Sequence, residues 1–193
     1  MTAIYLIRHG KTIANEQRLY CGATDLPLSP DGAREIARLK EQGIYPPSVD
    51  VCVTSGLARA QQTLDVIYGD VPRTVLSALA EYNFGQFEMK GYEQLKDLDD
   101  YRAWVSDQTE AASCPGGESK GEFSRRVLAG YSLLEQKARE HGNVLAVCHG
   151  GVIACIMEHL LPGEQNFYEW QPQSGRGYVI VRQPDGVCRY EKI

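Results

Sequence analysis

Short apolar runs alternate along the chain with longer segments in which apolar residues recur every three or four positions. The runs are rich in β-branched and aromatic residues, which is typical of buried strands. The last two runs alternate apolar and polar residues around Pro184-Asp185-Gly186 and predict an antiparallel hairpin. In chain order, the expected strands cover residues 3–7, 49–53, 73–76, 144–148, 178–183 and 187–190.

The segments between these strands predict helices. Ser29 followed by proline supplies a cap and a first turn for a helix that closes at Gly43. Another helix follows the second strand, and Thr54 or Ser55 is its expected cap. Two further helices are expected, a long striped one over residues 123–142 and a fully apolar one over residues 152–161.

Strands that alternate with helices predict an α/β fold, a three-layer α/β/α sandwich whose sheet is mostly parallel with an antiparallel C-terminal strand. A length of 193 residues fits a single domain spanning residues 1–193. In such sheets, ligands bind beyond the carboxyl ends of the strands. Three strand ends therefore carry the candidate chemistry: Arg8-His9-Gly10, Thr54-Ser55-Gly56 leading to Arg59, and His149-Gly150-Gly151.

Two of the four histidines and two arginines thus gather at one edge of the predicted sheet. Arginine grips the oxygens of a phosphoryl group in a bidentate way, and histidine adds a nucleophile. The alternative is a metal site at His9 and His149, but such sites normally recruit a third ligand. Cys148 is the nearest in sequence, and as a strand residue it should point into the core. The pattern favours a phosphate site without a metal.

The composition limits the classes of binding partner that we expect for this chain. Lys and Arg number 20 and Asp and Glu 25, a net charge of −5 that argues against a nucleic-acid or membrane partner. The first ten residues do not resemble a signal peptide and no apolar run approaches about 18 residues, so we expect a cytoplasmic protein. No C-x-x-C pair occurs, and we expect reduced core cysteines at positions 21, 52, 114, 148, 155 and 188.

Arg8-His9-Gly10 after an N-terminal strand resembles the RHG signature of the histidine phosphatase superfamily, the phosphoglycerate mutase-like enzymes. Five further segments resemble motifs of that family in the family's order. They are residues 22–32 (GATDLPLSPDG), 55–63 (SGLARAQQT), 79–85 (LAEYNFG), 115–119 (PGGES) and 147–151 (VCHGG). By size, the chain is most similar to the α-ribazole phosphatases and broad-specificity phosphatases of the family.

The resemblance implies a role for each residue of the cluster. His9 would attack phosphorus in line and carry the phosphoryl group as phosphohistidine. Arg8, Arg59 and His149 would bind the equatorial oxygens, where charge is spread in the transition state. Glu81 would donate a proton to the leaving oxygen and then accept one from water. No metal or organic cofactor is implied.

Three further positions, Asn15, Gly22 and Gly150, are assigned to substrate binding on the same resemblance, although asparagine in a loop is often only a turn former. Two departures from the family pattern are visible. Lys11 stands where many members have Glu or Gln, and it could touch the phosphate or face solvent. Glu88 is followed by Met89-Lys90 where a glycine is common, which leaves the role of Glu88 open.

Residues 82–120 are expected to form a lid over the site. Within them, residues 88–113 hold three basic and seven acidic residues, a net charge of −4. The lid aromatics could be its own small core, or some of them could stack on a flat leaving group. They and the aromatics just before them are Tyr82, Phe84, Phe87, Tyr92, Tyr101 and Trp104.

Three functions remain in view. The first is a phosphomonoesterase that works through phosphohistidine on a small phosphorylated metabolite, with α-ribazole 5′-phosphate as one candidate. The second is an isomerase, phosphoglycerate mutase, and the third is a non-catalytic phosphate-binding module. The acidic lid favours the phosphatase, because a mutase must also hold a second anionic group. The oligomeric state is open.

Overall fold

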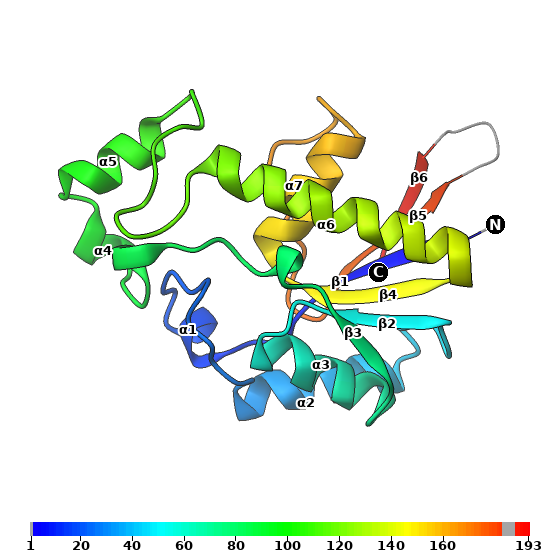
Figure 1. Ribbon diagram of the computed structural model, residues 1–193. Helices are drawn as coiled ribbons and strands as arrows, with labels where there is room; N and C mark the ends of the chain where they lie inside the picture. Colours follow the sequence, from blue (N-terminus) through cyan, green and yellow to red (C-terminus); the bar gives the residue numbers. More distant parts are fainter. Residues whose placement is uncertain (1, 183–187) are drawn as a thin grey trace.

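The computed structural model describes residues 2–182 and 188–193. Within these residues a six-stranded sheet has helices on both faces, with strand order β3-β2-β4-β1-β5-β6 (Figure 1). The strands are β1 (Ala3–Arg8), β2 (Val51–Thr54), β3 (Arg73–Val75), β4 (Val144–Cys148), β5 (Gly177–Arg182) and β6 (Cys188–Lys192). The predicted three-layer sandwich is confirmed.

Strand directions also follow the prediction. Strand β4 pairs in parallel with β1 and with β2, and β2 pairs in parallel with β3. Strands β5 and β6 add an antiparallel edge, β5 against β1 and β6 against β5. The expected turn at Pro184-Asp185-Gly186 lies outside the described residues.

Seven α-helices occur in the described part of the chain. They are α1 (Ile13–Glu16), α2 (Pro30–Glu41), α3 (Ala58–Tyr68), α4 (Tyr92–Leu95), α5 (Asp99–Ser106), α6 (Lys120–His141) and α7 (Gly150–Leu160). The predicted cap of α2 is confirmed, because Ser29 Oγ accepts from the Gly32 amide at 3.0 Å. Helix α6 begins with a capping box in which Ser119 and Glu122 each bind the other's backbone N–H.

The predicted cap of α3 is wrong. Its N-cap is Leu57, whose side chain makes no capping hydrogen bond. Gly56 has a φ of +93°, a conformation that favours glycine, and it turns the chain before the helix starts. The hydroxyl of Ser55 is used instead on the ring of His149, 2.8 Å away. A contact from a distant strand thus takes the side chain that local sequence assigned to the helix.

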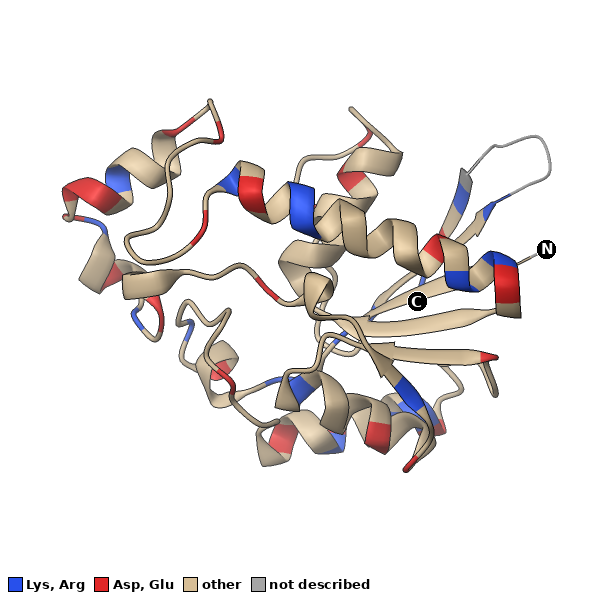
Figure 2. Cartoon of the chain, in the orientation of Figure 1, with Lys and Arg blue, Asp and Glu red and all other residues tan. Residues whose placement is uncertain are grey.

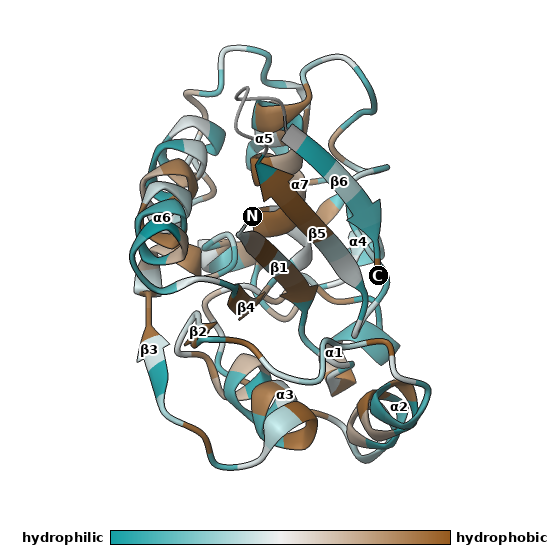
Figure 3. Ribbon diagram, turned by 90° about the vertical axis from the view of Figure 1, so that its right-hand side faces the viewer, coloured by the Kyte–Doolittle hydropathy of each residue, from teal (hydrophilic) through white to brown (hydrophobic). Residues whose placement is uncertain are grey.

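Each face of the sheet has its own hydrophobic core, and β4 shows why. All five of its residues are buried, and their side chains alternate between the two faces. Val144, Ala146 and Cys148 join the core that includes α6 and α7, whereas Leu145 and Val147 join the core of α2 and α3. Burial of such side chains stabilises the fold by about 1.5–3 kcal/mol each for the larger ones. Strands β1 and β5 are largely hydrophobic and edge strand β6 hydrophilic (Figure 3), which protects the edge from pairing with other chains.

The segment between β3 and α6 carries the short helices α4 and α5 beyond one end of the sheet (Figure 1), and acidic residues mark α5 (Figure 2). Phe87, Leu95 and Tyr101 are buried there, with the Phe87 and Tyr101 rings 5.6 Å apart. These side chains belong to the same hydrophobic core as α6 and α7, so the expected separate core of the lid is wrong, and stacking of lid aromatics on a leaving group stays a prediction. Tyr92 is 60% exposed and is not part of this core.

The described cysteines are free, but they are not all core residues. Cys114, Cys148 and Cys155 are buried, and half-buried Cys52 packs against the core of α2 and α3. Cys21 is half-buried outside both cores, so the prediction is wrong for Cys21. The Cys188 side chain lies outside the described part of the chain. Over the described ranges, every helix is too short or too polar to cross a bilayer.

Candidate active site

Two histidines meet where β1 and β4 end side by side. Arg8 and Cys148 are partners in the parallel register, so the next residues, His9 and His149, leave the sheet together. The His9 amide donates to the Cys148 carbonyl at 3.0 Å, and the two ring centroids are 5.0 Å apart. Both residues are buried. The sheet therefore fixes their spacing through its backbone.

The ring of His9 has a defined tautomer. Its Nδ1 lies 2.6 Å from the Gly10 carbonyl, and because a carbonyl only accepts, Nδ1 carries the proton. Nε2 then keeps a lone pair. Burial, followed by the positive charge of Arg59, lowers the pKa of His9 to about 3. At neutral pH, His9 is an uncharged imidazole with one nucleophilic nitrogen.

In His149 the other ring nitrogen, Nε2, makes the hydrogen bond, whereas in His9 it is Nδ1. His149 Nε2 lies 2.8 Å from Ser55 Oγ, which already accepts a longer bond from the Leu57 amide. The Ser55 hydroxyl can donate to Nε2 or accept from it, and the ring proton lies on Nδ1 when the serine is the donor. That Nδ1 is buried and has no partner among the described residues. Burial, with His9 and Arg59 nearby, lowers the pKa of His149 well below its usual value. The ring is therefore uncharged at neutral pH.

Two arginines flank the histidines. Arg59 is 1% exposed, and its guanidinium donates to the carbonyls of Gly22 (2.7 Å) and Thr24 (2.9 Å). Arg8 donates through Nη1 to the Pro172 carbonyl at 2.8 Å, while its buried Nε has no partner among the described residues. Burial lowers the pKa of Arg8, but an arginine stays charged in proteins. Gly150 makes room for this guanidinium, because a Cβ there would lie 3.1 Å from Arg8 Cζ.

Glu81 reaches the same edge from the loop after β3. Its carboxylate accepts from the amides of Gly151 (3.1 Å) and Tyr82 (2.9 Å). A Cβ at position 151 would lie 2.6 Å from Glu81 Oε1, so the glycine lets the carboxylate approach. Its negative charge also acts on Arg8. The structure thus brings together all five residues that were assigned to the chemistry.

Other predicted positions lie elsewhere or have structural contacts. The side-chain oxygen of Asn15 accepts from the Thr12 amide at 2.9 Å and completes the cap of α1, so its contact with substrate stays a prediction. Lys11 forms an ion pair with Glu35 at 2.8 Å and its side chain is 47% exposed, so it partly faces solvent, and its contact with phosphate stays a prediction. Gly22 offers its carbonyl to Arg59, which is a positioning contact.

Glu88, whose role the sequence left open, holds the loop that orients Arg59. Its carboxylate accepts from the amides of Gly22, Ala23 and Thr24 at 2.9–3.2 Å and from the Thr24 hydroxyl. The next residue, Met89, has a φ of +58°, the left-handed conformation that glycine adopts most easily.

Sequence analysis also missed Arg126, which lies in α6 and bonds to the backbone around Glu81. It follows the PGGES segment by seven residues, and nothing in the apolar stripe of α6 marks it. Its contacts depend on how α6 packs beside the loop. A local sequence pattern does not carry that information.

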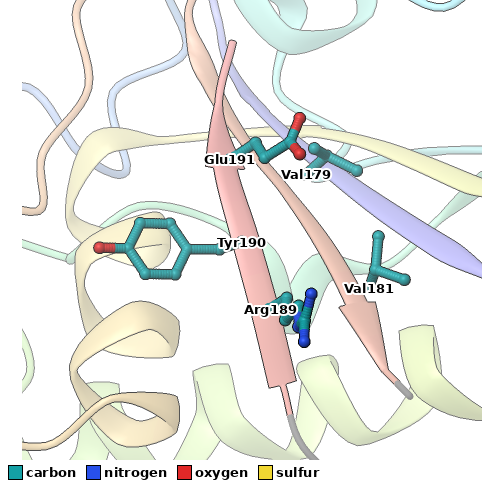
Figure 4. Close-up of a pocket in the computed structure, with 5 residues that line it drawn as sticks. All are labelled: Val179, Val181, Arg189, Tyr190 and Glu191. Carbon is teal, nitrogen blue, oxygen red and sulfur yellow. The ribbon is translucent and has the colours of Figure 1, made fainter.

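No group of three or more His, Cys, Asp or Glu side chains in the described ranges is arranged to hold a metal ion. Metal independence stays a prediction. A hollow of about 260 Å³ lies on the β5–β6 hairpin (Figure 4). It includes Val181, which pairs with Ala3 at the start of β1, whereas His9 follows the end of that strand. The hollow is separate from the candidate site.

Comparison with known proteins agrees with the geometry. The family model of the histidine phosphatase superfamily (branch 1) matches residues 4–193. The adenosylcobalamin/alpha-ribazole phosphatase of Escherichia coli (strain K12) is 32% identical over 162 residues, 82% of this chain and 78% of that protein.

Solved structures of similar proteins have the same fold as this chain. The alpha-ribazole phosphatase of Shigella flexneri aligns with a TM-score of 0.85 at 28% identity, over 98% of this chain and 94% of that one. Phosphoglycerate mutase from Thermus thermophilus aligns with a TM-score of 0.73 at 26% identity, over 99% and 98% of the two chains. The chain therefore resembles both phosphatases and a mutase.

Proposed function

The chain belongs to the histidine phosphatase superfamily, and on that premise we propose that it hydrolyses a small phosphomonoester through a phosphohistidine at His9. The Nε2 lone pair of His9 attacks phosphorus while the ester P–O bond breaks and the leaving oxygen takes a proton from Glu81, which enters this step as a carboxylic acid and leaves it as a carboxylate. Water then attacks phosphorus, Glu81 takes a proton from it, and the P–N bond breaks. Inorganic phosphate leaves and both side chains return to their initial states.

One observation carries this proposal: the neutral ring of His9 lies beside Arg8, Arg59 and His149. The Nδ1–H bond to the Gly10 carbonyl leaves Nε2 as the free nucleophilic atom. The nearby arginines hold a negative phosphoryl group where that nitrogen can reach it, and they also keep the ring unprotonated. Stabilisation of charge by preorganised donors is the main source of catalysis in phosphoryl transfer.

Two buried nitrogens at the site, Arg8 Nε and His149 Nδ1, have no hydrogen-bond partner among the described residues. Arg8 Nε is a donor, and His149 Nδ1 is a donor when Nε2 accepts from Ser55. An unsatisfied buried donor costs about 1–3 kcal/mol, which a ligand oxygen would recover. A phosphoryl group supplies several such oxygens, with negative charge that suits both arginines. The orphaned donors thus support a bound anion at the two histidines.

A phosphatase fits the lid better than a mutase. A mutase holds a substrate with a second anionic group, which requires further cations. Two of the three basic residues in 88–113 form ion pairs with neighbouring carboxylates, Lys96 with Glu93 and Arg102 with Asp97. The net charge of −4 over residues 88–113 opposes a second anion. The likeness to a mutase structure nevertheless makes isomerisation the second candidate.

Turnover of a phosphomonoester panel tests the proposal. The panel includes α-ribazole 5′-phosphate, sugar phosphates, nucleotides and 3-phosphoglycerate with catalytic 2,3-bisphosphoglycerate. We expect release of inorganic phosphate, unaffected by EDTA. Rapid formation of 2-phosphoglycerate with negligible phosphate release would make the protein a mutase, and binding without turnover would make it a phosphate-binding module.

A further inference from the structure

An ion pair at the start of helix α6 lies against the loop that carries Glu81. Arg126 Nη2 lies 2.7 Å from Glu118 Oε1, and Arg126 Nε lies 3.3 Å from Glu118 Oε2. The side chains are 28% and 15% exposed, so water competes little for the contact. A bidentate arginine–carboxylate pair fixes geometry as well as supplying energy. The pair is a rigid element beside the candidate site.

Arg126 uses its other contacts on the backbone that leads to Glu81. Its Nη1 donates to the carbonyls of Ala78 (2.9 Å) and Ala80 (2.8 Å), and Nη2 makes a longer bond to the Glu81 carbonyl (3.4 Å). The carbonyls of Ala80 and Glu81 lie outside the helices and strands. The partly buried carbonyls of this irregular loop depend on side chains for their partners. Arg126 supplies those partners.

Glu118 holds the chain on the other side of Glu81. Its Oε1 accepts from the Asn83 amide at 2.8 Å, and its own amide donates to the Asn83 carbonyl at 3.0 Å. Its carbonyl accepts from the Tyr82 hydroxyl at 2.7 Å. The backbone is thus fixed immediately before and immediately after Glu81. Little freedom is left for the direction of the carboxylate.

We propose that Arg126, paired with Glu118, is a positioning residue that orients the Glu81 carboxylate for proton transfer to the leaving oxygen. The inference rests on the proposed role of Glu81. Arg126 acts through Glu81 and not on the phosphoryl group. Because a displacement of about 1 Å can cost about 10²-fold in rate, its loss slows substrates that need a proton and spares those that do not.

Two aryl phosphates of matched shape separate these cases. Phenyl phosphate needs protonation of its leaving oxygen, whereas p-nitrophenyl phosphate does not. For Arg126→Met we expect kcat/KM on phenyl phosphate to fall about 10- to 100-fold and on p-nitrophenyl phosphate less than about threefold. The control is Arg125→Met, an exposed arginine one residue earlier on the same helix, which should change both by less than about twofold. Equal losses on the two substrates overturn the proposal.

A second variant guards against a folding defect. Removing one partner of a half-buried pair leaves a charge uncompensated and destabilises the protein. Glu118→Gln keeps an amide oxygen for Asn83 and should give the same leaving-group pattern in a smaller amount. In a Glu81→Gln background, Arg126→Met should cost nothing further on phenyl phosphate, because both changes affect one proton transfer. Additive losses overturn the proposal.

An NMR measurement tests the positioning without using activity. The Gly151 amide donates to Glu81 Oε2, so its signal reports where the carboxylate lies. We expect the signal to shift in Arg126→Met as it does in Glu81→Gln, and to stay in place in Arg125→Met. If Glu81→Gln affects both aryl phosphates equally, the proposed function of Glu81 fails while this measurement still decides the positioning. An unmoved Gly151 signal in folded Arg126→Met overturns it.

Discussion

The two halves of the candidate site are built differently. The phosphate half, defined as Arg8, His9, Arg59 and His149, lies at the ends of β1 and β4 and in the first turn of α3. Its histidines leave paired strands, so backbone hydrogen bonds set their positions. The donor half, defined as Glu81, lies on an irregular loop that side chains from the start of α6 hold in place.

In the proposed mechanism, this difference separates phosphate binding from proton transfer. A sheet edge can present several fixed donors to one phosphoryl group, since neighbouring strands end together. A loop can bring a carboxylate close to the same point, and changes in the loop can suit the position of that carboxylate to a different leaving group. Perturbing the phosphate half should therefore affect every substrate, whereas perturbing the donor half should affect only substrates that need a proton.

The largest expected effect is at Glu81. Without its proton, the leaving oxygen departs as an alkoxide or phenoxide, and loss of a general acid costs about 10² to 10⁴ in rate. Glu81→Gln should lose this much kcat on alkyl and phenyl phosphates and far less on p-nitrophenyl phosphate. The control is Glu88→Gln, whose contacts are with the loop that holds Arg59, and it should slow both classes equally. A larger leaving-group dependence at Glu88 would reverse the assignment.

Alanine substitutions at two adjacent glycines, Gly150 and Gly151, compare the two halves of the site most directly. Gly150→Ala places a methyl group 3.1 Å from Arg8 Cζ, and Gly151→Ala places one 2.6 Å from Glu81 Oε1. Both positions begin α7, where alanine is compatible with the backbone. We expect Gly150→Ala to slow both aryl phosphates alike, and Gly151→Ala to slow phenyl phosphate about 10-fold more than p-nitrophenyl phosphate. If both variants showed the same ratio of losses on the two aryl phosphates, the two halves of the site would not have separate roles.

The sequence alone predicts the phosphate half well, because strand ends can be located from apolar runs. The strand at 144–148 and the cap at Ser29 depend on neighbours a few residues away, and the structure has both as predicted. Ser55 was assigned wrongly because its partner, His149, is 94 residues distant. Glu81 was found only through a family motif, and Arg126 was missed. Loop geometry depends on tertiary contacts that no local pattern records.

Acid stability tests the burial of the phosphate half. In the unfolded chain, His9 takes up a proton near its ordinary pKa of 6.5, whereas the folded protein does so near 3. The stability it contributes is thus present above pH 6.5 and is lost as the pH falls toward 3. Between pH 7 and 5 this difference amounts to about 2 kcal/mol. We expect urea denaturation without phosphate to show that the free energy of unfolding falls between pH 7 and 5 by about 2 kcal/mol less in His9→Gln than in the wild type. Equal losses would mean that folded His9 titrates normally.

The smallest effect concerns the loop beside the donor half. Met89 adopts a left-handed backbone conformation that costs an L-residue about 1–2 kcal/mol. Glycine avoids this cost, but it loses more conformational entropy than Met when the chain folds, which cancels part of the gain. Met89→Gly should raise the free energy of unfolding by about 0.5 kcal/mol. Met89→Ala keeps a Cβ and should give no gain. A loss of stability in Met89→Gly would show that the Met side chain matters more than the backbone.

The phosphohistidine itself is the most direct test of the proposed chemistry. Brief reaction with a labelled phosphomonoester, an acid-free denaturing quench and peptide mapping should place the phosphoryl group on His9. It should be bonded to Nε2, because Nδ1 donates to the Gly10 carbonyl. His9→Ala should carry no label. A phosphoryl group on His149, or on Nδ1 of His9, or turnover that persists in His9→Ala, would contradict the mechanism.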